Sequence, residues 1–137
     1  MKKVLIICIV TSLVGVSCRR NEDQIPNIAV DIYLNINEPS NFNLSVVGGA
    51  DTYTGGSNGI IVYRNSLSEF SAYDRHVPYN IEEYCQLQLL DDGLILEDPC
   101  SGSQWIIVDG SLAQGPAVLS LQGYNTTFVD PLIHIWN

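Results

Sequence analysis

The stretch from 28 to 36 alternates strictly between apolar and other residues, and this period of two constrains the fold more than any other feature of the chain. In an extended chain, one side would carry Ile28, Val30, Ile32, Leu34 and Ile36, and the other side Asp31, Tyr33 and Asn35. Such alternation is typical of a strand with one face buried. The chain is therefore expected to build a sheet from its first ordered segment.

Short apolar segments follow at regular spacing to the end of the chain, and Gly, Asn and Asp separate them. Two hairpins are expected: one pairs 60–64 with 70–74, and one turns at Asp91-Asp92-Gly93, which suits a type I′ turn. No stretch has a helical period. The prediction is an all-β domain, a sandwich or partly open barrel of short antiparallel strands. Further strands are expected at 44–47, 87–90, 94–96, 105–108, 118–121, 124–129 and 132–136.

The N-terminus is predicted to direct export. Basic residues precede an apolar run at 4–14 that is too short to span a bilayer and suits a signal peptide. The run leads to Cys18, as at a bacterial lipoprotein processing site, although an ordinary secretory cleavage nearby is the alternative. We expect a signal peptide at 1–17, a lipid-anchored tether at 18–27 that begins with Cys18, and a domain at 28–137. The expected location is the bacterial cell envelope.

The charge balance excludes some partners. The formal net charge is −9, and a chain beginning at Cys18 would lose Lys2 and Lys3 and reach −11. So acidic a chain is not expected to bind nucleic acid or anionic lipid headgroups. Solubility outside the cell is the favoured interpretation, and an acidic face for a cationic partner or ion is the alternative.

Motifs of known catalytic sites are absent from the sequence. The glycine cluster at 55–59 has neither the lysine nor the following helix of a phosphate-binding loop, so we interpret it as a turn. No nucleophile elbow or His-Glu-x-x-His motif occurs, and the chain has only two histidines. The protein is therefore predicted not to be an enzyme.

Two segments carry a family resemblance. The strings Ala72-Tyr73-Asp74-Arg75-His76-Val77-Pro78-Tyr79 and Asp98-Pro99-Cys100-Ser101-Gly102-Ser103 resemble the two cluster-binding loops of Rieske iron–sulfur proteins. A Gly-Pro-Ala turn at 115–117 follows in the family order. The resemblance implies a Rieske-like fold from about residue 28 to the end.

The resemblance also implies where a 2Fe–2S cluster would be held. The family uses Cys-x-His in the first loop and Cys-x-x-His in the second. The matching positions here are Val77, Tyr79, Asp98 and Ser101, and none of them suits that cluster. We expect a degenerate site without cluster, cofactor or metal.

Cys85 and Cys100 match the two cysteines that join these loops in many family members. The two other cysteines fall in the predicted signal peptide and at its processing site, which leaves an even pair in an oxidising compartment. A disulfide is expected. Closing a loop of about fifteen residues stabilises a chain by about 3 kcal/mol in the chain-entropy model.

Another metal could use oxygen ligands near the loops. Such a site, for calcium or a similar ion, would combine His76 with nearby oxygens from Asp74, Tyr79, Glu97 and Asp98. The spacing matches no known calcium loop, so these acids are interpreted as solvated. His76 is expected to be a surface or hydrogen-bonded residue, and His134 a strand-face residue.

The function predicted from these features is that of a non-catalytic envelope lipoprotein whose Rieske-like domain has a binding or accessory role. Its partners would be the membrane, through Cys18, and an envelope protein at the loop tip. Val77 and Tyr79 are expected to fill the space of the cluster and form a small apolar patch there. The alternative is electron transfer through a Rieske-type 2Fe–2S or other metal centre.

Overall fold

The computed structural model describes residues 23–137, so the predicted signal peptide, Cys18 and residues 19–22 lie outside the described part. Within residues 23–137 the chain forms ten strands and two short 3₁₀ helices, which confirms the all-β prediction. The elements are, in chain order, β1 (Asp31–Asn35), η1 (Pro39–Ser45), β2 (Ala50–Tyr53), β3 (Ile60–Arg64), β4 (Phe70–Asp74), η2 (Ile81–Glu83), β5 (Gln88–Leu89), β6 (Ile95–Glu97), β7 (Gln104–Ile106), β8 (Leu112–Gln114), β9 (Asn125–Val129) and β10 (Leu132–Trp136).

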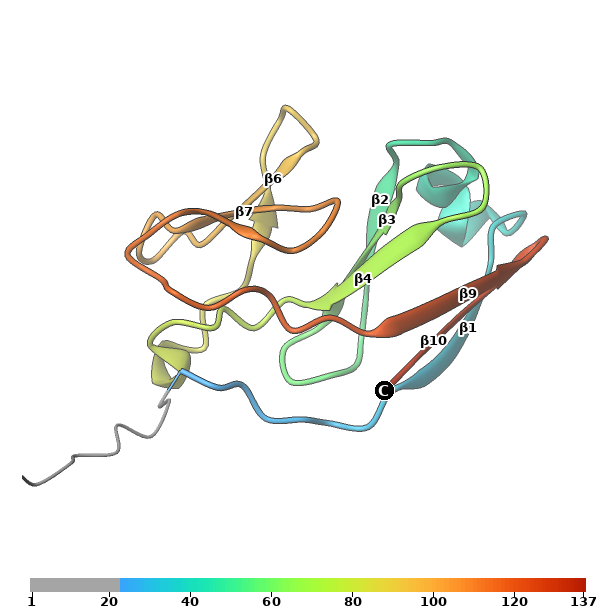
Figure 1. Cartoon of the computed structure of the whole chain (residues 1–137). Coiled ribbons are helices and arrows are strands. Elements are labelled where there is room, and N and C mark those ends of the chain that lie inside the picture. Colours follow the sequence, from blue (N-terminus) through green and yellow to red (C-terminus); the bar gives the residue numbers. More distant parts are fainter. Residues whose placement is uncertain (1–22) are drawn as a thin grey trace, which may run out of the picture.

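The strands form three antiparallel sheets that do not close into a barrel. Their orders are β1-β10-β9, β2-β3-β4 and β5-β6-β7-β8. In Figure 1 the third sheet lies on the left, away from the other two. The expected β3–β4 hairpin is present, with Ile60 opposite Asp74 and Arg64 opposite Phe70.

Strand β3 is buried on both faces and therefore contributes to two cores. Ile60 and Val62 belong to a core that includes residues of β1, β4 and β10. Ile61 and Tyr63, which alternate with them, belong to a second core that includes Trp105 of β7. Full burial of such side chains stabilises a fold by about 1.5–3 kcal/mol each. The second core thus attaches the third sheet and its loops to the rest of the domain.

Strand β1 confirms most of the alternation seen at 28–36. Val30, Leu34 and Ile36 are buried, whereas Ile28 is 46% exposed. Pairing with β10 begins only at Asp31, which lies opposite Trp136. Ile28 therefore precedes the paired residues of β1 and remains largely exposed.

Two expected strands are absent. Residues 44–47 were predicted to be extended, but Leu44 lies in η1 and reaches the first core from there with no exposed surface. The second, at 118–121, is irregular: the Leu119 carbonyl accepts the Trp105 indole N–H and the Leu121 N–H donates to the Gly110 carbonyl. Short apolar runs do not distinguish a strand from other buried segments. Strands β2 and β8 were not predicted.

The β5–β6 hairpin is present, but the prediction of a type I′ turn was wrong. A type I′ turn needs positive φ at both central residues, and Gly93 alone has it here, at 70°. The Gly93 N–H donates to the Leu90 carbonyl. Oδ1 of Asp92 accepts the N–H groups of Leu94 and Ile95, at 2.9 and 3.1 Å. Asp92 therefore stabilises a longer turn through its side chain.

Residues 23–27, the described end of the predicted tether, run along the domain (Figure 1). Ile25 is buried, and Oδ1 of Asp23 accepts a 2.7 Å hydrogen bond from the Asn80 N–H. Among the helices within residues 23–137, none has the length and apolar character needed to cross a membrane.

Candidate functional site

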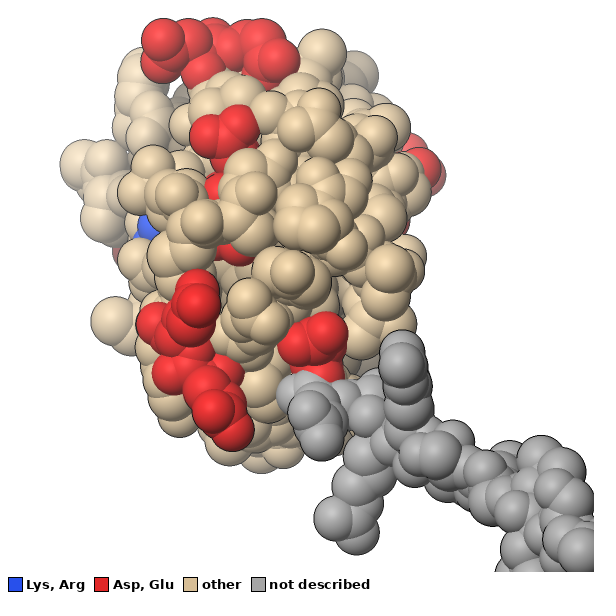
Figure 2. All heavy atoms as spheres, turned by 90° about the vertical axis from the view of Figure 1, so that its left-hand side faces the viewer, with Lys and Arg blue, Asp and Glu red and all other residues tan. Residues whose placement is uncertain are grey.

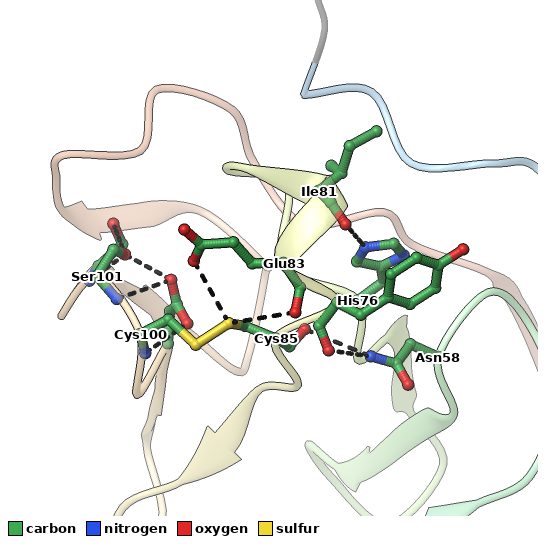
Figure 3. Close-up of a disulfide and its surroundings, with 10 residues drawn as sticks. Asn58, His76, Ile81, Glu83, Cys85, Cys100 and Ser101 are labelled. Atoms are coloured by element: carbon green, nitrogen blue, oxygen red, sulfur yellow. Dashed lines mark hydrogen bonds between the residues drawn. A yellow bond between two sulfur atoms is a disulfide. The ribbon is translucent and has the colours of Figure 1, made fainter.

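Two loops meet beside the third sheet and form the candidate site, here called the tip. The first loop runs from 75 to 87, between β4 and β5, and the second from 98 to 103, between β6 and β7. The predicted disulfide between Cys85 and Cys100 is confirmed and joins the two loops, with their Cα atoms 6.4 Å apart (Figure 3).

In the second loop, the carboxylate of Asp98 organises the backbone. Asp98 is buried, and its Oδ1 accepts the Cys100 N–H at 2.9 Å. Its Oδ2 accepts both the N–H and the hydroxyl of Ser101, at 3.2 and 2.5 Å. Both carboxylate oxygens are therefore occupied by donors within the loop, and Asp98 and Ser101 contact each other directly.

Ser103 links the second loop to the Gly-Pro-Ala turn. Its hydroxyl has no exposed surface; it accepts the Ala117 N–H at 2.9 Å and lies 2.9 Å from the Ser101 hydroxyl, whose single hydrogen is donated to Asp98. The segment after β8 is thus held against the second loop by a serine hydroxyl.

In the first loop, Val77 has no exposed surface and Tyr79 is half-buried, and both pack in the second core. Since Val77 is fully buried, it cannot be part of the apolar surface patch that the sequence suggested. The exposed large apolar side chains of the third sheet and its loops are instead Tyr84, Leu94, Ile106, Val108 and Val118, at 64%, 49%, 37%, 44% and 78% exposure.

His76 is buried and hydrogen bonded through both ring nitrogens. Nε2 lies 2.8 Å from the Ile81 carbonyl, and Nδ1 lies 2.8 Å from the Ser57 hydroxyl. A carbonyl only accepts, so Nε2 carries a hydrogen, and Nδ1 of a neutral ring accepts from Ser57. The ring also stacks on Tyr84, with centroids 4.9 Å apart. His76 therefore positions the first loop, in line with the predicted hydrogen-bonded role.

Asp74, at the end of β4, fixes the glycine-rich turn against the same loop. It has no exposed surface, and its oxygens accept four donors. These are the N–H groups of Ser57, Asn58 and His76 and the Tyr124 hydroxyl, at 2.6, 3.1, 2.8 and 2.7 Å. Burial, followed by the hydrogen bond and the charge of Asp74, raises the pKa of Tyr124 well above its usual range.

The interpretation of these acids as solvated was wrong for two of them. Asp74 and Asp98 are buried because backbone N–H groups replace their hydration. Each carboxylate already has hydrogen-bond donors, and within residues 23–137 neither belongs to a group of side chains close enough together to hold a metal ion. His134, in contrast, lies on a strand face as predicted, with Nε2 2.7 Å from Asp31 and its ring stacked on Tyr33 and Trp136.

Glu83 was missed by the sequence reasoning. Its Oε2 lies 3.8 Å from Sγ of Cys85, next to the disulfide (Figure 3). A disulfide sulfur has no hydrogen to donate, so this is a contact rather than a hydrogen bond. Within the described chain, Glu83, Cys85 and Cys100 are the one set of at least three potential metal-binding side chains whose ligand atoms lie close together, all within 4.8 Å. The Glu-x-Cys spacing was the available signal.

Acidic residues far outnumber basic ones within residues 23–137. This part of the chain contains fourteen acidic residues, no lysine and two arginines. Arg64 donates to four backbone carbonyls and Arg75 to the Leu87 carbonyl. Burial lowers the pKa of Arg75 below its usual range. Figure 2 shows several groups of acidic atoms on the side that carries the tip.

No protein-family model and no curated protein matches the sequence. Solved structures do match. The plasma membrane Rieske protein PetC3 of the cyanobacterium Synechocystis PCC 6803 aligns with a TM-score of 0.57 and 20% identity, over 74% of this chain and 97% of its own. The fold is Rieske-like. A chain from the complex of reduced oxygenase and oxidized ferredoxin in carbazole 1,9a-dioxygenase aligns with a TM-score of 0.53 and 18% identity, over 77% and 93%. At these identities the likeness establishes the fold of the Rieske-like domain alone.

Proposed function

We propose that this Rieske-like domain holds no 2Fe–2S cluster and serves an envelope lipoprotein as a non-catalytic binding or accessory domain. The hydrogen bond between Ser101 and Asp98 carries the proposal. In the Rieske pattern these two positions would supply an imidazole and a thiolate to the cluster. Here the two side chains bind each other and the backbone of their own loop.

The remaining donors do not fit the cluster either. Val77 has no lone pair, and Tyr79 offers only a phenol, a hard oxygen ligand for a sulfide-bridged cluster. The two thiols of the described chain are joined in the Cys85–Cys100 disulfide. No thiolate and no pair of imidazoles is left at the tip for two iron atoms.

A lipid on Cys18 would hold the domain at a membrane. The apolar run that ends at this cysteine supports the proposal, because it suits a lipoprotein signal. Asp23 binds Asn80 of the first loop, so a tether of only a few residues would separate the lipid from the tip. The tip would then stay close to the membrane surface.

A partner at the tip would meet exposed apolar side chains among acids. Tyr84 is 64% exposed beside two exposed acids of η2, Glu82 and Glu83. Both arginines of the described chain donate to backbone carbonyls, and neither forms a salt bridge with Glu82 or Glu83. An envelope protein with a basic surface around an apolar pocket is the complementary partner.

Photo-crosslinking tests the binding role. A photoreactive amino acid replaces Tyr84 at the tip, or Leu67 in the β3–β4 turn, which is 77% exposed, as the matched control. We expect one discrete adduct from position 84 in intact cells, which weakens when Glu82 and Glu83 are changed to Gln. Equal adducts from both positions, or none from position 84, would contradict a docking role for the tip.

A further inference from the structure

We propose that the tip becomes a binding site for a soft divalent metal ion such as Zn²⁺ when the Cys85–Cys100 disulfide is reduced. The ligands would be the two thiolates and the carboxylate of Glu83. Their ligand atoms already lie within 4.8 Å of one another. The inference is independent of the proposed absence of an iron–sulfur cluster, since it uses other residues and another redox state.

The geometry suits tetrahedral coordination. Zinc binds thiolate at about 2.3 Å and carboxylate at about 2.1 Å, so a tetrahedral site places oxygen and sulfur about 3.6 Å apart. Oε2 of Glu83 lies 3.8 Å from Sγ of Cys85. Two thiolates on one zinc are about 3.8 Å apart. The 6.4 Å between the two Cα atoms leaves room for the sulfurs to separate after reduction.

Contacts within the first loop position Glu83 beside the disulfide. Tyr84, between Glu83 and Cys85, has a φ of 53°, which is uncommon for a non-glycine residue. Its ring stacks on His76, and the His76 ring is held by Ser57 and the Ile81 carbonyl. This packing turns the chain so that Glu83 and Cys85 lie on the same side. None of these contacts depends on the disulfide.

The second loop would also keep its shape after reduction. Asp98 fixes the Cys100 N–H through Oδ1, and Ser103 ties the loop to Ala117. Cys100 and Glu83 are exposed, so a water molecule or a group of a partner can occupy a fourth coordination position. The surrounding negative charge favours a cation.

Reduction of the Cys85–Cys100 disulfide needs a donor of two electrons. A dithiol reductant is oxidised to its disulfide, and its two electrons and two protons convert the Cys85–Cys100 disulfide to two thiols. Zn²⁺ binding then releases both thiol protons, because the thiolate is the ligand. In the reverse direction, a disulfide oxidant accepts two electrons from the two thiolates, the Cys85–Cys100 bond forms again and Zn²⁺ is released, so metal occupancy would report the redox state of the compartment.

Metal titration of the reduced protein tests the proposal. The full-length chain carries Cys8→Ser and Cys18→Ser, so that only Cys85 and Cys100 provide thiols. A phosphine reduces it without oxygen, desalting removes the phosphine, and competition with a chromophoric chelator measures Zn²⁺ binding. We expect about one Zn²⁺ per reduced chain and none tightly bound to the oxidised chain. Cd²⁺ should give a thiolate charge-transfer band in the ultraviolet.

Glu83→Gln and Glu82→Gln are matched variants, since both remove one exposed acid of η2. Glu83→Gln should weaken Zn²⁺ binding at least about tenfold. Losing a residue that only hydrogen bonds to a zinc ligand already has an effect of that size, and Glu83 would be a ligand itself. Glu82→Gln should change it less than about twofold. Equal losses in both variants, no binding by reduced protein, or loss of the strand circular dichroism signal on reduction would each overturn the proposal.

Discussion

The Ser101 hydroxyl donates a 2.5 Å hydrogen bond to Oδ2 of Asp98, and this contact closes the second loop of the tip. The same carboxylate accepts the N–H groups of Cys100 and Ser101. The Gly102 N–H donates to the Asp98 carbonyl at 2.8 Å. A loop that the Rieske pattern would build around iron is thus held by one aspartate.

Replacing Asp98 by Ala should destabilise the domain by at least about 2–3 kcal/mol. The change removes hydrogen bonds to a charged group and leaves two loop N–H groups without their acceptor, each a contribution of this order. Denaturant unfolding of the two proteins measures the difference. Asp91→Ala, at an exposed acid of the β5–β6 turn, is the control and should change stability by less than about 0.5 kcal/mol. Equal effects would contradict the structural role of Asp98.

Gly56→Ala should destabilise far more than Gly93→Ala, although both glycines have positive φ, at 60° and 70°. A Cβ on Gly56 would overlap with both Oδ2 of Asp74 and the Tyr124 hydroxyl, whereas a Cβ on Gly93 would meet nothing within 4 Å. Backbone strain alone costs about 1 kcal/mol in each, and the overlap at Gly56 adds to it. The melting temperatures of the two variants give the comparison, and similar values would refute the packing around Asp74.

Much of the fold could be predicted because alternation and turn residues are local signals. The period of two located β1, and short apolar runs bounded by turn residues located the β3–β4 hairpin and β10; the bounds of these strands match the sequence prediction or fall inside it. The Cys85–Cys100 pair was also predictable, since two cysteines were left for one bridge. Leu44 shows the limit: its apolar side chain reaches the core from a 3₁₀ helix, and an apolar run of four residues is compatible with either structure.

The position of the candidate site could be predicted from the sequence, but the hydrogen bonds that hold its loops could not. Asp74 and Asp98 were predicted to be solvated because most of their donors are backbone N–H groups. Nearly every residue has such a group, so the sequence does not show which of them bind a carboxylate. Tyr124 contacts Asp74 across 50 positions of the chain, a pairing that only the packing of β9 beside β4 creates. Local patterns do not report such long-range contacts.

Tyr124→Phe should weaken the fold and flatten its alkaline sensitivity. The variant loses a hydrogen bond to a buried carboxylate, a loss of about 1.5–3 kcal/mol at neutral pH. Folding raises the pKa of Tyr124 above the value of 10.0 for a free tyrosine. Its contribution is therefore complete below about pH 10 and is lost as the pH rises further.

The free energy of unfolding, measured from pH 8 to 11, should consequently fall less steeply in Tyr124→Phe than in the unchanged protein. Part of the slope should remain, because burial also raises the pKa of Tyr53 and Tyr73. Parallel curves for the two proteins would show that Tyr124 does not retain its proton through contact with Asp74.

Cys18→Ala should release the protein from the membrane fraction or leave its signal peptide uncleaved. The expectation follows from the apolar run that leads to Cys18, and two or three acyl chains would anchor the protein durably. Membrane fractionation and intact mass reveal the outcome. Cys8→Ala, within the same run, is the control and should leave both unchanged. An unaltered mature mass and membrane share in Cys18→Ala would exclude the lipid anchor.

The absence of an iron–sulfur cluster is tested most directly by purifying the full-length protein without oxygen and measuring iron content, visible absorption and electron spin resonance together. We predict a colourless protein with no stoichiometric iron, because Val77, Tyr79, Asp98 and Ser101 stand at the four positions that would bind the cluster. About two iron atoms per chain, with visible absorption and the electron spin resonance of a Rieske centre, would contradict this account.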